Sequence, residues 1–162
     1  MDRVPYVFCD HVVTNLNNAC FMKTLRGQWG TAAEEHIKRR GDFILFVIAT
    51  NDRNNWIVKF VPYPGGWALS FKAFRKLRGS HIRITKVLIV YRPDKIDPTV
   101  PVALDRLVSK LLPAIRPYIA FHSLFEFQAG KCPHSEAVNA ILNYFTTTCH
   151  FQGITVEHYG TQ

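Results

Sequence analysis

Cysteine and histidine are the side chains of this 162-residue chain that are best suited to chemistry, because both can bind metal ions and transfer protons. Cys132 lies two residues before His134. Cys149 and His150 are adjacent, seventeen residues further on. Structural zinc sites use Cys-x2–4-Cys and His-x3–5-His spacings, and adjacent residues of a strand point to opposite faces. The spacing therefore predicts buried thiols and ordinary histidines, with no metal and no cofactor.

The common catalytic motifs do not occur in the sequence. There is no phosphate-binding GxxxxGK[ST] or GxGxxG, no GxSxG nucleophile turn and no HExxH zinc-protease motif. Four histidines fall in predicted strands or directly after one, with no nucleophile or acid placed for acid–base catalysis. We therefore expect no catalytic residue and no enzyme activity. The four are His81, His122, His150 and His158.

Composition indicates a folded chain that does not cross a membrane. Hydrophobic residues make up 48% of the sequence and charged residues 20%, as in globular proteins. The longest apolar run, residues 43–49, is far shorter than the roughly 20 residues of a membrane-spanning helix. No apolar segment typical of a secretory signal follows Met1, and the four cysteines show no pairing pattern. We therefore expect a cytoplasmic or nuclear protein with free thiols.

Positive charge is concentrated in one segment. The net charge is +8, and residues 53–93 contain nine lysines and arginines but no aspartate or glutamate. Phe71 and Phe74 alternate with these cations, a composition found on surfaces that bind single-stranded nucleic acid. Phe71, Phe74 and Leu77 also have the spacing of an amphipathic turn with an apolar inner face, so both interpretations stay open. The predicted basic surface comprises Lys72, Arg75, Lys76, Arg78, Arg83 and Lys86.

The first 41 residues have the pattern of three short helices. Pro5 suits the first position of a helix, and apolar side chains then recur at i, i+4 and i+8. Further on, Thr31 and Glu34 have the spacing of a capping box, and Gly41 is a natural helix-ending residue. The predicted helices are residues 4–16, residues 19–25 with Gly27 closing them, and a segment after Trp29 that ends at Gly41.

Beyond residue 41 the pattern changes to β-branched and aromatic runs. The polar turn NDRNN joins the first two runs as a hairpin. From residue 81 the order strand–helix–strand–helix–strand favours parallel strands, whose starts lie 31 to 37 residues apart. That spacing fits either a leucine-rich-repeat-like stack or an open βαβ unit. The fold class is therefore α+β, in which a helical module precedes a hairpin and a small βαβαβ region. Predicted strands are 43–50, 56–61, 67–71, 81–91, 118–127 and 149–157; predicted helices run from Asp97 or Thr99 to Leu112, ended by Pro113 and Pro117, and over 135–145.

The apolar positions of the first predicted helix have the register of an F-box. That module begins with a Leu-Pro pair, places apolar residues four, eight, nine and twelve positions later, and closes with a tryptophan. The segments MDRVPYVFCD and WGTAAEEHIKRR also resemble the corresponding segments of a nematode-expanded group of F-box-like proteins. The resemblance covers residues 1 to about 45. The residues in register are Val4, Pro5, Phe8, Val12, Val13, Leu16, Phe21, Leu25 and Trp29.

The resemblance implies a division of labour between two parts of the chain. Residues 1–41 would dock on a Skp-type adaptor of a cullin ubiquitin ligase, and residues 42–162 would recruit an unknown substrate protein. The alternative function is that of a basic nucleic-acid-binding α/β domain. A docking face should leave Pro5, Phe8 or Leu16 partly exposed, whereas an ordinary amphipathic helix would pack on residues 43–162.

Overall fold

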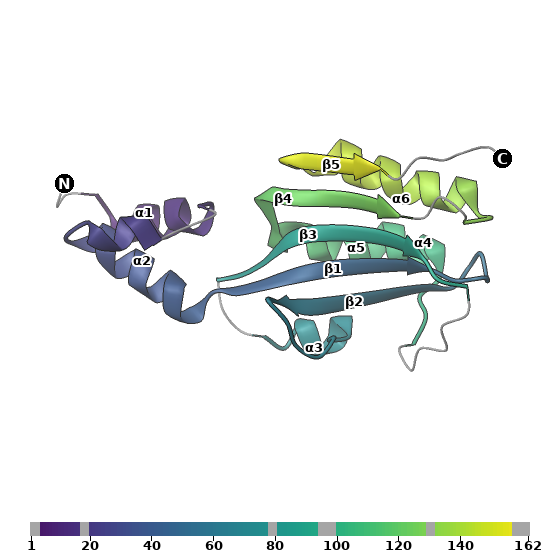
Figure 1. The fold of residues 1–162 in the computed structure, drawn as a ribbon, viewed down its shortest axis with the longest axis horizontal. Coiled ribbons are helices and arrows are strands. Elements are labelled where there is room, and N and C mark those ends of the chain that lie inside the picture. Colours follow the sequence, from purple (N-terminus) through teal and green to yellow (C-terminus); the bar gives the residue numbers. More distant parts are fainter. Residues whose placement is uncertain (1–3, 17–19, 78–80, 94–99, 129–131, 157–162) are drawn as a thin grey trace.

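The chain folds into a helical segment at one end and a five-stranded sheet with its own helices, as the computed structural model in Figure 1 shows. This mixture of helix and sheet confirms the predicted α+β class. The structure describes residues 4–16, 20–77, 81–93, 100–128 and 132–156. Five residues named above lie outside these ranges: Met1, Arg78, Asp97, Thr99 and His158.

The helical segment consists of α1 (Tyr6–Thr14), the 3-10 helix η1 (Cys20–Thr24) and α2 (Gln28–Arg39). Pro5 directly precedes α1 with a φ of −59°, the value that its ring imposes and that the start of a helix accepts. The predicted middle helix is a 3-10 helix, and none of its residues is buried. Without a buried apolar side there is little packing energy to stabilise a longer α-helix at this place.

The ends of α2 differ from the prediction. Its N-cap is Gly27, which has a φ of +72° that favours glycine. Thr31 lies inside the helix and donates its hydroxyl hydrogen to the Gly27 carbonyl oxygen over 3.3 Å, so the predicted capping box with Glu34 does not form. Gly41 is the first residue of a strand, because the backbone is already extended at Arg40, where ψ is 122°.

The sheet has the strand order β2-β1-β3-β4-β5 (Figure 1). The first two strands form the predicted antiparallel hairpin, and the neighbouring pairs β1–β3, β3–β4 and β4–β5 are parallel. Of the two interpretations of the strand spacing, the structure has the open βαβ arrangement. The strands are β1 (Gly41–Ala49), β2 (Trp56–Tyr63), β3 (Ile82–Tyr91), β4 (Ile119–Gln128) and β5 (Gly153–Val156).

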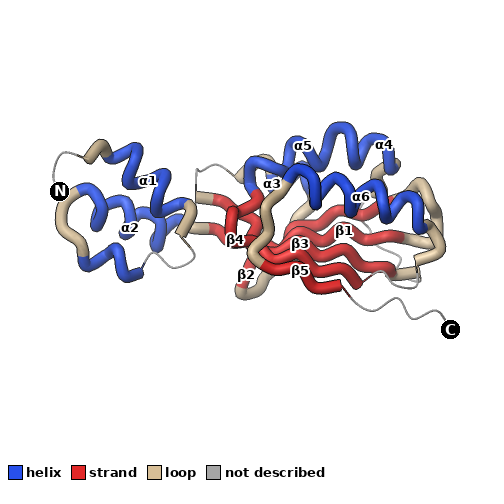
Figure 2. The backbone as a smooth tube through the Cα atoms, turned by 90° about the horizontal axis from the view of Figure 1, so that it is seen from above, coloured by secondary structure: helices blue, strands red, loops and turns tan. Residues whose placement is uncertain are grey.

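The helices that follow the hairpin lie on one face of the sheet (Figure 2). The main core forms between them and alternate strand residues, and the rings of Phe60 and Phe74 stack there with centroids 4.0 Å apart. The opposite face carries a smaller apolar cluster that includes Ile48, Ile57 and Leu88, and none of the described helices covers it. The helices are α3 (Phe71–Phe74), α4 (Leu104–Arg106), the π-helix η2 (Leu107–Leu111), α5 (Leu112–Ile115), the 3-10 helix η3 (Arg116–Tyr118) and α6 (Ser135–Thr148).

Pro113 does not end its helix, contrary to the prediction. A proline inside a regular α-helix removes one hydrogen bond, and its ring collides with the carbonyl four residues earlier. Directly before Pro113 the helix widens into the π-turn η2, where the Leu112 N–H donates to the Leu107 carbonyl oxygen. The wider turn lets the helix continue through Pro113 as α5 and reach η3, which contains Pro117.

Residues 67–71 do not form the predicted strand. Only Leu69 pairs with a strand, through an isolated bridge to Phe60. Trp67 is 93% exposed, and Phe71 already begins α3. A single bridge does not hold a strand in the sheet, so this segment is the connection from β2 to α3.

Gly30 of α2 allows the end of η1 to approach the helix closely, because a Cβ atom at this position would lie 2.2 Å from the Leu25 carbonyl oxygen. We predict that Gly30→Ala lowers the free energy of unfolding by about 1–3 kcal/mol, despite the better helix propensity of alanine. Denaturant unfolding followed by circular dichroism measures the change. Gly153→Ala is the control, since its Cβ would meet, at 3.2 Å, only a methyl group of the exposed Leu124 side chain. Equal losses in the two variants would contradict the prediction.

Candidate functional site

The apolar stripe of α1 packs on α2 through a small core of its own. Cys9, Val13 and Ala32 are fully buried there, and Val4 and Trp29 pack partly against them. Val13 is therefore an internal residue of the helical segment. The sequence offered two positions for this stripe, packed on residues 43–162 or facing a partner. The structure has a third, because much of the stripe packs between α1 and α2.

Several predicted docking residues nevertheless remain exposed on this segment. Phe8 is 54% exposed and Phe21 is 58% exposed. The Phe8 ring meets Trp29 edge-to-face, with centroids 6.0 Å apart. Leu25 is 37% exposed and directly follows η1, which packs on α2. Pro5 is exposed as well, whereas Val12, Leu16 and Trp29 are half-buried.

Val7 belongs to this exposed set, although the sequence analysis did not include it. It is 77% exposed on α1 and directly precedes Phe8. In the F-box register the position carries no apolar requirement, so the pattern offered no signal for it. We call Val7, Phe8, Phe21 and Leu25, which lie on α1 and at η1, the exposed apolar set; Ile37 of α2 is 41% exposed and is not counted in it.

The basic segment divides into two groups in the structure. Lys72, Arg75 and Lys76 are exposed on α3 and just after it, as predicted for a basic surface. With Phe71 and Arg106 they line an open cavity of about 400 Å³. The Arg75 guanidinium lies over the Phe71 ring, 5.8 Å from its centroid. Arg106, from the distant helix α4, is a member of this group that the sequence did not reveal.

Arg83 and Lys86 do not belong to a free basic surface, contrary to the prediction. Arg83 is only 7% exposed, and its Nε donates to Asp42 Oδ1 over 2.6 Å. Its Nη1 donates to the Leu16 carbonyl oxygen over 2.9 Å. Lys86 forms an ion pair with Glu126 of the neighbouring strand β4. Both positive charges are thus neutralised within the fold.

The Lys86–Glu126 pair makes stability depend on pH. The hydrogen bond from Lys86 lowers the pKa of Glu126 from its ordinary value of 4.5. A carboxyl group whose pKa is lowered by folding stabilises the protein above its unfolded pKa, and this stabilisation is lost as the pH falls through the folded pKa. The pair therefore acts at neutral pH and is lost in acid below about pH 4.5.

We predict that Lys86→Gln lowers the free energy of unfolding by up to about 1 kcal/mol at pH 7 and by less at about pH 3, because the pair is partly exposed. Urea unfolding of variant and parent at both pH values measures the difference. Lys76→Gln, an exposed lysine of the same segment, serves as the control and should show no such change. A Lys86→Gln loss that is equally large in acid would contradict the role assigned to Glu126.

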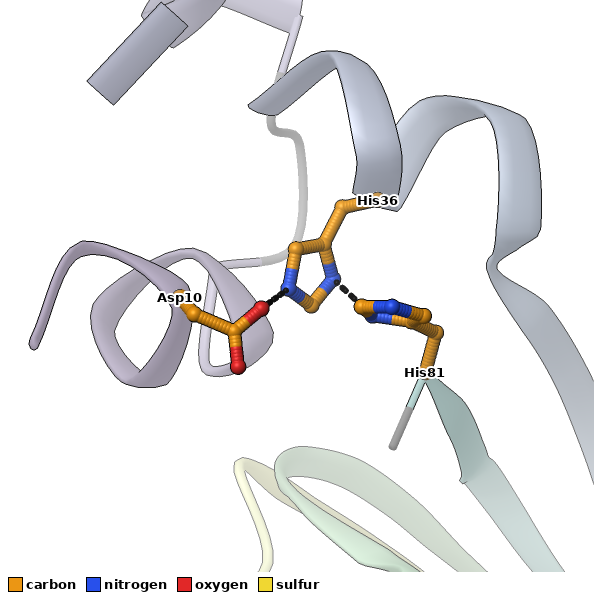
Figure 3. A group of neighbouring side chains, drawn as sticks. All are labelled: Asp10, His36 and His81. Atoms are coloured by element: carbon orange, nitrogen blue, oxygen red, sulfur yellow. Dashed lines mark hydrogen bonds and ion pairs between the residues drawn. The ribbon is translucent and has the colours of Figure 1, made fainter. Parts of the chain in front are cut away.

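A buried polar cluster joins the helical segment to the sheet, as Figure 3 shows. His36 of α2 lies between Asp10 of α1 and His81, the residue before β3. Its Nε2 is 3.0 Å from Asp10 Oδ1, and its Nδ1 is 3.3 Å from His81 Nδ1. The two imidazole rings meet edge-to-face, with centroids 4.2 Å apart. Three segments far apart in the sequence thus meet at one point.

Burial affects the protonation of His36, the central residue of this cluster. His36 is fully buried and His81 is 8% exposed, whereas Asp10 retains 25% of its side-chain exposure. Burial lowers the pKa of His36 below its ordinary value of 6.5, although the hydrogen bond to Asp10 opposes this shift. His36 is therefore neutral at neutral pH, with one ring nitrogen available as an acceptor or as a metal ligand.

Sequence spacing does not reveal this cluster. Metal-site motifs have short spacings, whereas Asp10 and His36 are 26 residues apart and His36 and His81 are 45 residues apart. The only local signal was the type of the three residues, and sixteen other histidines, aspartates or glutamates in the chain match it equally well. Among the described residues, Asp10, His36 and His81 are the one group in which three potential ligands come together.

The cysteine and histidine pairs considered for zinc have other surroundings. Cys132 and Cys149 are half-buried free thiols that pack against the main core, and burial raises the pKa of Cys132. His134 Nε2 lies 3.0 Å from the Asn51 carbonyl oxygen. His150 is exposed. None of these four residues belongs to a group of three potential ligands within the described ranges.

Comparison with known proteins adds no relative. No protein-family model matches the sequence, and neither a curated protein nor a solved structure matches it. The likeness to F-box-like proteins therefore rests on the register of the apolar residues listed above. None of the helices in the described part of the chain has both the length and the apolar character needed to span a bilayer.

Proposed function

We propose that the chain is a protein-interaction adaptor that docks through its N-terminal helical segment. The partner would be the Skp-type subunit of a cullin ubiquitin ligase, in the cytoplasm or the nucleus. The observation that carries this proposal is the exposed apolar set, in which Phe8 and Phe21 are each more than half exposed. Large aromatic side chains of this kind dominate binding energy when a partner buries them.

The arrangement of the exposed set suits a helix-and-groove interface. Val7 and Phe8 lie on α1, while Phe21 lies on η1 and Leu25 directly follows it; η1 packs on α2. Trp29 supports the Phe8 ring from α2. A partner groove could therefore bury side chains from two neighbouring elements that the helical segment already holds in place. The F-box register of these residues favours the Skp-type subunit over other partners.

Residues 42–162 would then bind the protein that is to be modified. The exposed cations on α3 and just after it provide surface for this purpose, and none of the described helices covers the other face of the sheet. No step of ubiquitin transfer would take place on this chain, because an adaptor acts by bringing two proteins together. This division follows the boundary between α2 and β1, near residue 41.

We predict that Phe8→Asp combined with Phe21→Asp abolishes co-purification with a recombinant Skp-type subunit, since each change places a charge in the apolar contact. Phe121→Asp is the matched control, because Phe121 lies on β4 and is 61% exposed. Circular dichroism checks that all variants are folded. Binding that survives the double change, or that is lost equally with Phe121→Asp, would exclude the proposed docking face.

A second candidate is nucleic-acid binding by the cations around α3. Lys72, Arg75, Lys76 and Arg106 surround one cavity with the ring of Phe71 at its wall, which offers both phosphate contacts and a stacking surface. None of these four cations forms an ion pair with another described residue. They are therefore available to an external anion.

For this second function we predict that Lys72→Gln with Arg75→Gln weakens binding to mixed-sequence single-stranded RNA and reduces the salt dependence of the binding constant by about 1–2 units of log–log slope. Fluorescence anisotropy at several salt concentrations measures both quantities. Lys38→Gln with Lys110→Gln removes two exposed charges elsewhere and is the control. Binding that does not change with salt would exclude this function.

A further inference from the structure

We propose that Asp10, His36 and His81 form a binding site for a divalent transition-metal ion of the zinc class. The site goes beyond the adaptor function and does not depend on it, because it concerns how the helical segment is fastened to the sheet. Two imidazole nitrogens and one carboxylate oxygen are a ligand set that Zn²⁺ accepts. The same set would also accept Co²⁺, which serves below as a spectroscopic probe.

The distance between the two imidazoles of the cluster is close to that in a metal centre. The ligand atoms of the three residues all lie within 4.8 Å of one another. His36 Nδ1 and His81 Nδ1 are 3.3 Å apart. Tetrahedral zinc with bonds of about 2.0–2.1 Å places its ligand atoms about 3.3–3.4 Å from each other. The two imidazoles already have this separation. Asp10 contacts the other ring nitrogen of His36, Nε2, so binding of one ion by all three residues requires the His36 ring or the Asp10 side chain to turn.

The environment of the cluster favours metal-binding forms of the ligands. His36 and His81 are buried, so the surrounding fold restricts their rings, and a neutral imidazole is the form that binds a metal ion. Asp10 is the one ligand with substantial exposure, 25%, and it gives an ion a route from solvent. A carboxylate with two neutral imidazoles leaves a bound divalent ion with a single net positive charge in the site.

Nearby cations do not prevent an ion from binding. Arg40 and Arg83 are the arginines at this junction, and both contact Asp42. Arg40 also donates to the carbonyl oxygens of Thr14 and Leu16, over 3.2 Å and 2.5 Å. The guanidinium groups thus contact the Asp42 carboxylate and the carbonyl oxygens of the chain after α1. The Asp42 carboxylate balances part of their positive charge.

A bound ion would connect three parts of the fold. Asp10 lies on α1, His36 lies near the end of α2, and His81 directly precedes β3. Hydrogen bonds already hold these residues together through His36. Metal bonds would replace a chain of two hydrogen bonds by a single cross-link between the helical segment and the sheet. Because an unfolded chain does not hold the three ligands together, the ion should stabilise the fold.

The first test uses the full chain, stripped of metal with a chelator and then titrated with Co²⁺ or Zn²⁺ alone. We expect one Co²⁺ per chain, with the visible ligand-field absorption of a site containing nitrogen ligands. We expect Zn²⁺ at about one hundred times its dissociation constant to raise the unfolding temperature by roughly 5 °C or more. A chain that binds neither ion, or whose unfolding temperature does not respond to bound Zn²⁺, would overturn the proposal.

The second test assigns the ligands. Asp10→Asn keeps an oxygen that accepts the hydrogen bond from His36, so the fold is retained while the anionic ligand is lost. We expect this change, and likewise His81→Asn, to weaken Co²⁺ binding by at least about tenfold. His150→Asn, at an exposed histidine outside the cluster, is the control and should bind as the parent does.

Each outcome of the second test decides the assignment. Co²⁺ affinity that is unchanged in a folded Asp10→Asn variant would show that the ion binds elsewhere, and the proposal would fail. The same holds if His150→Asn weakens binding as strongly. If His81→Asn does not fold, Asp10→Asn alone gives the answer. Because the readout is metal binding by the purified chain, failure here is separate from a failure to bind a Skp-type subunit.

Discussion

The guanidinium group of Arg83 is buried between the helical segment and the sheet, and the arrangement of the whole chain depends on it. A guanidinium keeps its charge at every physiological pH, so it can be buried only where partners occupy its N–H groups. Asp42, its direct neighbour across the β1–β3 ladder, accepts two of its hydrogen bonds. The Leu16 carbonyl oxygen accepts another, which ties the end of α1 to the first residues of the sheet.

Beside this polar junction, the apolar packing of the helical segment leaves some of its apolar side chains exposed. α1 has enough apolar side chains for two contacts, and α2 uses only one side of it, through Cys9 and Val13. The other side of α1 presents Val7 and Phe8 to solvent. If α1 were only a core helix, these side chains would point toward the sheet. The side of the sheet at this junction instead carries the charged groups of Arg83 and Asp42.

The sequence predicted the features that depend on neighbouring residues. The NDRNN hairpin, strand β3 and helix α6 all follow from local turn residues and periodicity, and each lies within a few residues of its predicted position. The misses depend on contacts between distant residues. Arg83 looked like a surface cation because its partner, Asp42, is 41 residues earlier in the chain. Pro113 was predicted to end a helix because no sequence pattern predicts the π-turn that allows the helix to continue through it.

The same distinction applies to the candidate sites. The register of Phe8 and Trp29 could be recognised from spacing alone, whereas the meeting of His36 with His81 required the fold. Periodicity could not predict which apolar side chains are exposed. Val13 and Phe8 belong to one apolar stripe, yet only Phe8 faces solvent. Which side of an amphipathic helix is covered depends on what packs there, and α2 covers the side with Val13.

A single residue, Arg40, separates the last residue of α2 from the first residue of β1. With no linker at this point, and with Arg40 itself bonded to the carbonyl oxygens after α1, the helical segment has little freedom to swivel about the sheet. The chain would therefore act as a rigid spacer. A protein bound at α1 and another bound on the sheet would be held at one distance and one angle, so the reach between them would be determined by the length of β1 and its neighbours.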